Sequence, residues 1–182
     1  MPKRYVALLV LLILVSACGR AATPIPGWRS FEGQGVTLWL PSNYGQPSER
    51  RDTGADDAPR IVFEASESYL REGGGPLPAI VIVTRGHIPL LRSLRSYAED
   101  YATTTSTCFT CSAPVRVDLG CRRVWRVVVD RPDASLTTAV YLQRRGTTLW
   151  TISFGASTAV FDQTLAASEQ SMCTLRTAWF TR

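Results

Sequence analysis

The sequence predicts an α+β fold in which an antiparallel β-sheet of about six to seven strands is covered by two main helices. Three observations lead to this prediction. Seven short apolar or β-branched runs are bounded by turn residues. The last four of these runs are joined by links so short that they can only connect antiparallel neighbours. Two further stretches repeat apolar residues every three or four positions, which is typical of amphipathic helices that cover a sheet.

The first three predicted strands lie in the N-terminal half. Residues 35–40 alternate valine and leucine with threonine and tryptophan, and Pro41 ends the run. Residues 60–65 and 79–84 are two further β-branched runs. Between these two, residues 72–78 contain three glycines and two prolines. This composition predicts a mobile loop.

The first helix is predicted to begin near Pro89, because proline fits the first turn of a helix. After it, apolar residues recur at helical spacing. These are Leu90, Leu94, Tyr97, Ala98 and Tyr101. The second helix is predicted from Phe161 to about Leu175, on the spacing of Phe161, Leu165 and Met172.

Four strands are predicted between the helices, and tight links make them a meander. The strands are residues 115–119, 122–130, 136–143 and 147–154, and the links are residues 120–121, 131–133 and 145–146.

The N-terminus has the layout of a bacterial lipoprotein signal. Lys3 and Arg4 precede an apolar run over residues 5–15, which would span roughly 16 Å as a helix and is short of the ~20 residues that cross a membrane. Val15, Ser16, Ala17 and Cys18 then resemble a lipobox. We therefore expect residues 1–17 to be a signal peptide and Cys18 to carry lipid. The alternative is an ordinary secretory signal followed by a chance cysteine.

The remainder is predicted to be one anchored domain. Residues 18–27 would form an extended tether, and residues 28–182 a single domain. The expected location is extracytoplasmic, anchored by lipid to the cell membrane, or to the outer membrane if the cell has one. Without Lys3 and Arg4, 18 arginines face 15 acidic residues, a net charge of +3 that does not favour nucleic acid. Lys3 is the only lysine, which excludes lysine chemistry from the domain.

Four cysteines in the domain predict two disulfides in an oxidising compartment, with three possible pairings. If residues 120–121 form a hairpin turn, Cys111 lies roughly 25 Å along the strand from Cys121, and Cys108 is only three residues further away; bridged Cα atoms lie within ~7 Å. The pairing that survives is Cys108 with Cys111 and Cys121 with Cys173.

The Cys108–Cys111 pair has the C-x-x-C spacing of thiol–disulfide enzymes, so thiol–disulfide redox activity is the alternative function. The motif follows a predicted helix, whereas an attacking thiolate is usually stabilised at a helix start. A zinc site built on these cysteines is less favoured, because the hairpin separates them.

No other pattern predicts a catalytic, metal or cofactor site. His87 is the only histidine, and no G-x-S-x-G elbow, phosphate loop, dinucleotide fingerprint or H-E-x-x-H helix occurs. The strand tryptophans are expected in the core. Trp28 and Trp179 lie near the domain ends, and if exposed together they would mark a partner surface.

The chain resembles the PsbP-like domains, which occur as an extrinsic subunit of photosystem II and in many bacterial lipoproteins. The resemblance rests on short elements spread over most of residues 28–180. They are Phe31 before the strand that ends at Pro41, a central helix, Gly120 with Arg123, the strand with Trp150, Ile152 and Phe154, then Phe161, Thr174 and Leu175. It implies an α/β sandwich that serves as a binding or assembly module without a shared catalytic set. We therefore expect a non-catalytic module whose partner is a protein or a small ligand, and no cofactor.

Overall fold

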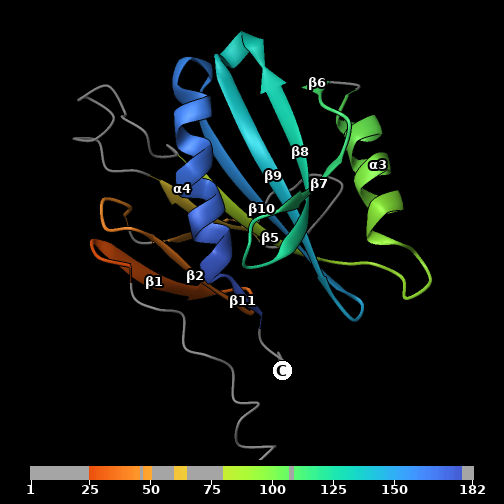
Figure 1. Ribbon diagram of the computed structural model, residues 1–182, viewed down its shortest axis with the longest axis horizontal. Helices are drawn as coiled ribbons and strands as arrows, with labels where there is room; N and C mark the ends of the chain where they lie inside the picture. Colours follow the sequence, from red (N-terminus) through yellow and green to blue (C-terminus); the bar gives the residue numbers. More distant parts are fainter. Residues whose placement is uncertain (1–24, 46, 51–59, 65–79, 107–108, 178–182) are drawn as a thin grey trace, which may run out of the picture.

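The computed structural model describes residues 25–45, 47–50, 60–64, 80–106 and 109–177. Within them, two antiparallel sheets and two helices are arranged in layers (Figure 1). The α+β fold predicted from the sequence is therefore confirmed. The predicted signal peptide, Cys18, the predicted loop at residues 72–78, Cys108 and Trp179 lie outside the described residues.

The large sheet has eight strands, ordered β3-β4-β5-β10-β9-β8-β6, with β7 also paired to β8. Its strands are β3 (Ser48–Arg50), β4 (Arg60–Glu64), β5 (Ile80–His87), β6 (Thr110–Cys111), β7 (Val115–Asp118), β8 (Arg123–Arg131), β9 (Leu136–Arg145) and β10 (Thr148–Ser157). The meander is confirmed, since β7, β8, β9 and β10 pair in chain order. Gly120 and Gly146 adopt positive φ in the two tight turns, as a hairpin loop requires.

The small sheet has three strands in the order β1-β2-β11. They are β1 (Trp28–Gly33), β2 (Val36–Pro41) and β11 (Arg176–Thr177). In β2, Val36, Leu38 and Leu40 are all buried, which confirms the predicted alternation. The sequence predicted neither β1 nor β11, nor that β2 would belong to a separate sheet.

The two helices are α3 (Leu94–Thr105) and α4 (Phe161–Thr174), with short 3-10 turns at Pro132–Ala134 and Thr158–Val160. The α4 prediction is confirmed. The predicted start of the first helix at Pro89 is wrong. Ser93 is the N-cap of α3 and its side chain accepts a hydrogen bond from the backbone N–H of Ser96, so the helix begins at Leu94.

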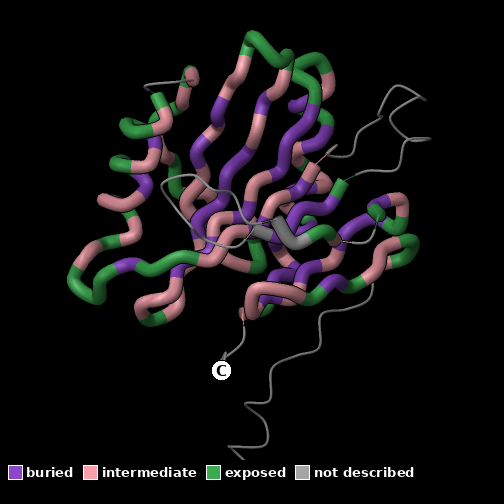
Figure 2. The backbone as a smooth tube through the Cα atoms, turned by 180° about the vertical axis from the view of Figure 1, so that it is seen from behind, coloured by how far each residue is buried: buried purple, intermediate pink, exposed green. Residues whose placement is uncertain are grey.

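The two faces of the large sheet are buried separately. On one face, α4 and the small sheet enclose a core of nineteen buried residues, including Trp150, Ile152, Phe154 and Met172. On the other face, α3 covers a cluster of six: Ala98, Ala102, Val127, Val129, Val140 and Leu142. The long strands of the large sheet carry much of the buried backbone in Figure 2.

Candidate functional site

Cys121 and Cys173 form a disulfide, with Cα atoms 5.6 Å apart. The bond joins the turn between β7 and β8 to the last turn of α4. The sequence predicted this pairing from the position of the hairpin turn. The structure supports the geometric reasoning, because Cys111 lies opposite Val129 near the far end of β8.

Cys111 forms no disulfide within the described residues. Its predicted partner Cys108 lies outside them, so the bridge between Cys108 and Cys111 stays a prediction. Pairing with β8 holds the side chain of Cys111 against the cluster beneath α3. Burial there raises the pKa of the Cys111 thiol, whereas an attacking thiol needs a lowered pKa. This environment does not favour the alternative redox function.

In the described part of the chain, no three histidine, cysteine or acidic side chains lie close enough together to bind a metal ion. His87 is exposed at the last position of β5, opposite Thr148 of β10.

Of the three strand tryptophans expected in the core, Trp150 is buried there, whereas Trp39 and Trp125 are half-buried. Trp150 is buried and its Nε1 donates to the backbone oxygen of Gln34, 2.9 Å away. Trp125 is half-buried against the cluster beneath α3. Trp28 is half-buried at the start of β1. Because Trp179 lies outside the described residues, a joint surface of Trp28 and Trp179 stays a prediction.

Several arginines bind backbone carbonyl groups and thereby join elements far apart in the sequence. Arg122 donates to the carbonyl of Leu175, and Arg145 donates to that of Thr177, 2.7 Å away. Arg126 pairs with Glu169 at 2.9 Å and so links β8 to α4. These partly buried guanidinium groups therefore link strands and helices of the fold.

The largest exposed apolar side chains in the described residues are Leu90, Leu91 and Val115. Leu90 is 69% exposed and Leu91 is 102% exposed, although the sequence placed Leu90 on the inner face of a helix. Both belong to the segment between β5 and α3, which we call the dileucine turn and define as residues 88–93. Ser93 could have indicated this exposure in the sequence, because a serine at that position can cap a helix that begins after the two leucines.

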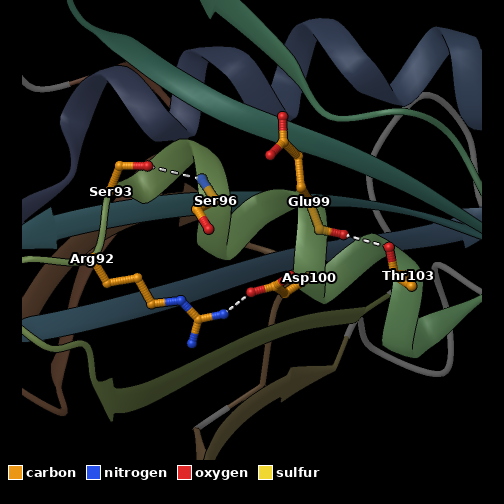
Figure 3. A network of polar contacts seen from close by, with 6 residues as sticks. All are labelled: Arg92, Ser93, Ser96, Glu99, Asp100 and Thr103. Atoms are coloured by element: carbon orange, nitrogen blue, oxygen red, sulfur yellow. Dashed lines mark hydrogen bonds and ion pairs between the residues drawn. The ribbon is translucent and has the colours of Figure 1, made fainter.

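The dileucine turn is held by Arg144 at the end of β9. The guanidinium group of Arg144 donates to the carbonyl oxygens of Pro89, Leu90 and Arg92. Arg92 in turn forms an ion pair with Asp100 of α3, beside the cap made by Ser93 (Figure 3). The two leucines are therefore presented by a turn whose backbone is fixed at both ends.

No helix in the described residues is long and apolar enough to span a membrane. No protein-family model and no curated protein sequence matches the chain. Among solved structures, it is similar to the solution structure of cyanobacterial PsbP (CyanoP) from Synechocystis sp. PCC 6803, with a TM-score of 0.51 and 11% sequence identity. The match covers 89% of this chain and 99% of the cyanobacterial one. The chain therefore has a PsbP-like fold, as the resemblance in its sequence implied.

Proposed function

We propose that this protein is an exported lipoprotein, anchored through Cys18, that acts as a non-catalytic binding or assembly module at a membrane surface. Its partner would be a protein or a small ligand. The observation that carries the proposal is the PsbP-like fold, matched over nearly the whole length of a PsbP chain. The lipobox-like residues before Cys18 add the anchor.

The way polar side chains are used supports a binding module rather than an enzyme. In the described residues, Arg122 and Arg145 hold backbone carbonyls, and Arg126 pairs with an acid of another element. The serines and threonines buried on α4 hydrogen-bond to its own backbone or to β2. These groups are committed to holding the fold together.

The proposed tether keeps the domain near the membrane. The segment from Cys18 to Gly27 reaches no more than about 30 Å at ~3.3 Å per residue. Several acyl chains at one site give a lasting anchor, whereas a single chain binds only marginally. The domain would therefore meet partners in the layer next to the bilayer.

Mass spectrometry of the N-terminal peptide of the wild-type protein tests the anchor. We expect the mature chain to begin at Cys18 and to carry a diacylglyceryl group. An unmodified N-terminus at another residue would contradict the proposal.

Cross-linking in native membranes, followed by purification of the lipidated protein, tests the binding role. A chain with Cys18→Ser behind a cleavable secretory leader is the control, because it has the same domain without lipid. We expect a defined cross-linked partner or bound ligand that depends on the anchor. Reductase or isomerase activity that is lost in Cys111→Ser would instead indicate a thiol enzyme.

A further inference from the structure

The dileucine turn is an apolar projection on an otherwise well-packed domain. It extends away from the sheet between the end of β5 and the start of α3, beside the tip of the β9–β10 hairpin (Figure 1). Leu90 and Leu91 are adjacent at its tip, where Leu91 is fully exposed and Leu90 exposes about two thirds of its surface. Large exposed apolar side chains gathered at one place mark an interaction surface.

The exposure of these leucines is fixed by the fold. Ile88, which begins the turn, is fully buried, and its N–H donates to the carbonyl of Thr147 at 2.8 Å. The N–H of Arg92 donates to the carbonyl of Pro89 at 3.1 Å, which closes a turn around the two leucines. With Arg144 bound to three carbonyls of the same turn, the leucines cannot fold back onto the domain without breaking several hydrogen bonds.

The surroundings of the tip are basic. Strand pairing places Gly86, Leu149 and Arg144 side by side, so the β9–β10 hairpin and the end of β5 lie at one end of the sheet. Residues 85–100 and 144–148 together contain five arginines and two carboxylates, a local charge of +3. Both carboxylates, Glu99 and Asp100, are already paired with arginine.

We propose that the dileucine turn inserts Leu90 and Leu91 into the interfacial layer of an anionic bilayer, while the net positive charge around the turn faces the lipid headgroups. The inference rests on the proposed function, because the lipid on Cys18 would hold the domain beside that bilayer. An apolar tip with a basic surround is the chemistry that anionic membrane surfaces bind. The anchor and the turn together would give the domain two contacts with the membrane and hence a fixed orientation.

A lipid surface fits this projection better than a protein does. A specific protein interface buries about 800 Å² on each partner, far more than two leucine side chains offer. Residues 88–93 themselves contain none of the aromatic side chains that are enriched in protein interfaces. A bilayer binds such a projection without a complementary pocket, because it offers an apolar layer beneath negatively charged headgroups.

Vesicle flotation tests the inference with the complete mature chain made without lipid, as Cys18→Ser behind a cleavable secretory leader. The vesicles contain phosphatidylglycerol and phosphatidylcholine, with pure phosphatidylcholine as the uncharged comparison. The test variant is Leu90→Ser with Leu91→Ser. Val115→Ser is the matched control, because Val115 is the other large exposed apolar side chain in the described residues and lies on β7.

We expect the unlipidated chain to bind anionic vesicles, more weakly at high salt and on pure phosphatidylcholine. The double leucine variant should bind at least about tenfold more weakly, and Val115→Ser should bind like the parent. Near-ultraviolet circular dichroism should show that both variants are folded, because the replaced side chains are exposed.

Equal binding by the parent and the double leucine variant, or no vesicle binding by the parent, would overturn the inference. Dissociation of a dimer by the leucine substitutions without a change in vesicle binding would also overturn it, and would assign the turn to self-association. Failure of the lipid anchor is a separate outcome, because it is read from the mass of the N-terminal peptide and the flotation assay uses no anchor.

Discussion

The two faces of the eight-stranded sheet are closed by different means. The face under α4 has a large continuous core, a disulfide and partly buried side-chain hydrogen bonds to the neighbouring sheet. The face under α3 has a small core and a helix whose polar contacts are mainly exposed ion pairs and an N-cap. Exposed ion pairs contribute little to stability, whereas buried apolar contacts contribute much. We infer that the α4 face stabilises the domain and that the α3 face, which carries the dileucine turn, is the more weakly held side.

Removal of the Cys121–Cys173 disulfide should have the largest effect on stability. A closed loop with a sequence separation of 52 is worth up to about 4 kcal/mol in the unfolded chain. Cys121→Ala with Cys173→Ala should therefore lower the free energy of unfolding by up to that amount, measured by urea denaturation. Cys111→Ala is the control on the α3 face and should cost less than about 1 kcal/mol. Equal losses would contradict the proposed difference between the faces.

Core truncation on each helix sharpens the same comparison. Met172 of α4 is fully buried, and Met172→Ala should cost about 3 kcal/mol. Leu94 of α3 is half-buried, and Leu94→Ala should cost about 1 kcal/mol because less apolar area is lost. Both values can be measured by urea denaturation. A larger loss at Leu94 than at Met172 would reverse the assignment of the stabilising face.

The same contrast explains which parts of the fold could be predicted from the sequence. Strands β8, β9 and β10 have nine or ten residues each, and the links of the meander are short. Apolar pattern and connection length were therefore enough to predict the meander and to place Cys121 at a turn. Strands β6 and β11 have two residues each and exist only because β8 and β2 offer them backbone partners.

The dileucine turn shows a second limit. Leu90 and Leu94 have helical spacing, so their periodicity predicted one helix face. The cap at Ser93 and the three carbonyl bonds from Arg144 decide the local structure instead, and Arg144 is 54 residues away from Leu90. A pattern of apolar residues contains no information on such a distant hydrogen-bond donor.

Tyr141 gives the α4 face a pH dependence. Its hydroxyl is fully buried near Arg126 and Glu169 and makes no hydrogen bond of good geometry with the described residues. Burial, above all, raises the pKa of Tyr141 to about 12, against about 10 in an unfolded chain. Because the pKa of Tyr141 is higher in the folded protein, its contribution to the free energy of unfolding is present in full below pH 10. This contribution is lost as the pH rises from 10 to 12.

Tyr141→Phe tests this dependence. At pH 7 the free energy of unfolding should change by less than about 1 kcal/mol, because the hydroxyl that is removed has no hydrogen-bond partner among the described residues and its desolvation penalty is removed with it. Above pH 10 the variant should become more stable than the parent, by roughly 2 kcal/mol near pH 12. Urea denaturation at several pH values measures both. A constant difference between the two proteins from pH 7 to 12 would show that Tyr141 does not titrate with folding.

The last comparison concerns one polar contact on each helix. Thr174 of α4 is buried, and its hydroxyl accepts a hydrogen bond of 2.9 Å from the backbone N–H of Trp39 in β2. Thr174→Val keeps the shape and leaves that N–H without its acceptor, which should cost about 2 kcal/mol. Ser93→Ala removes the exposed N-cap of α3 and should cost about 1 kcal/mol. Amide hydrogen exchange distinguishes the two, since Thr174→Val should speed exchange in β2 and Ser93→Ala only in the first turn of α3. If Ser93→Ala instead increased exchange across β2, the two faces would unfold as one unit and the comparison would fail.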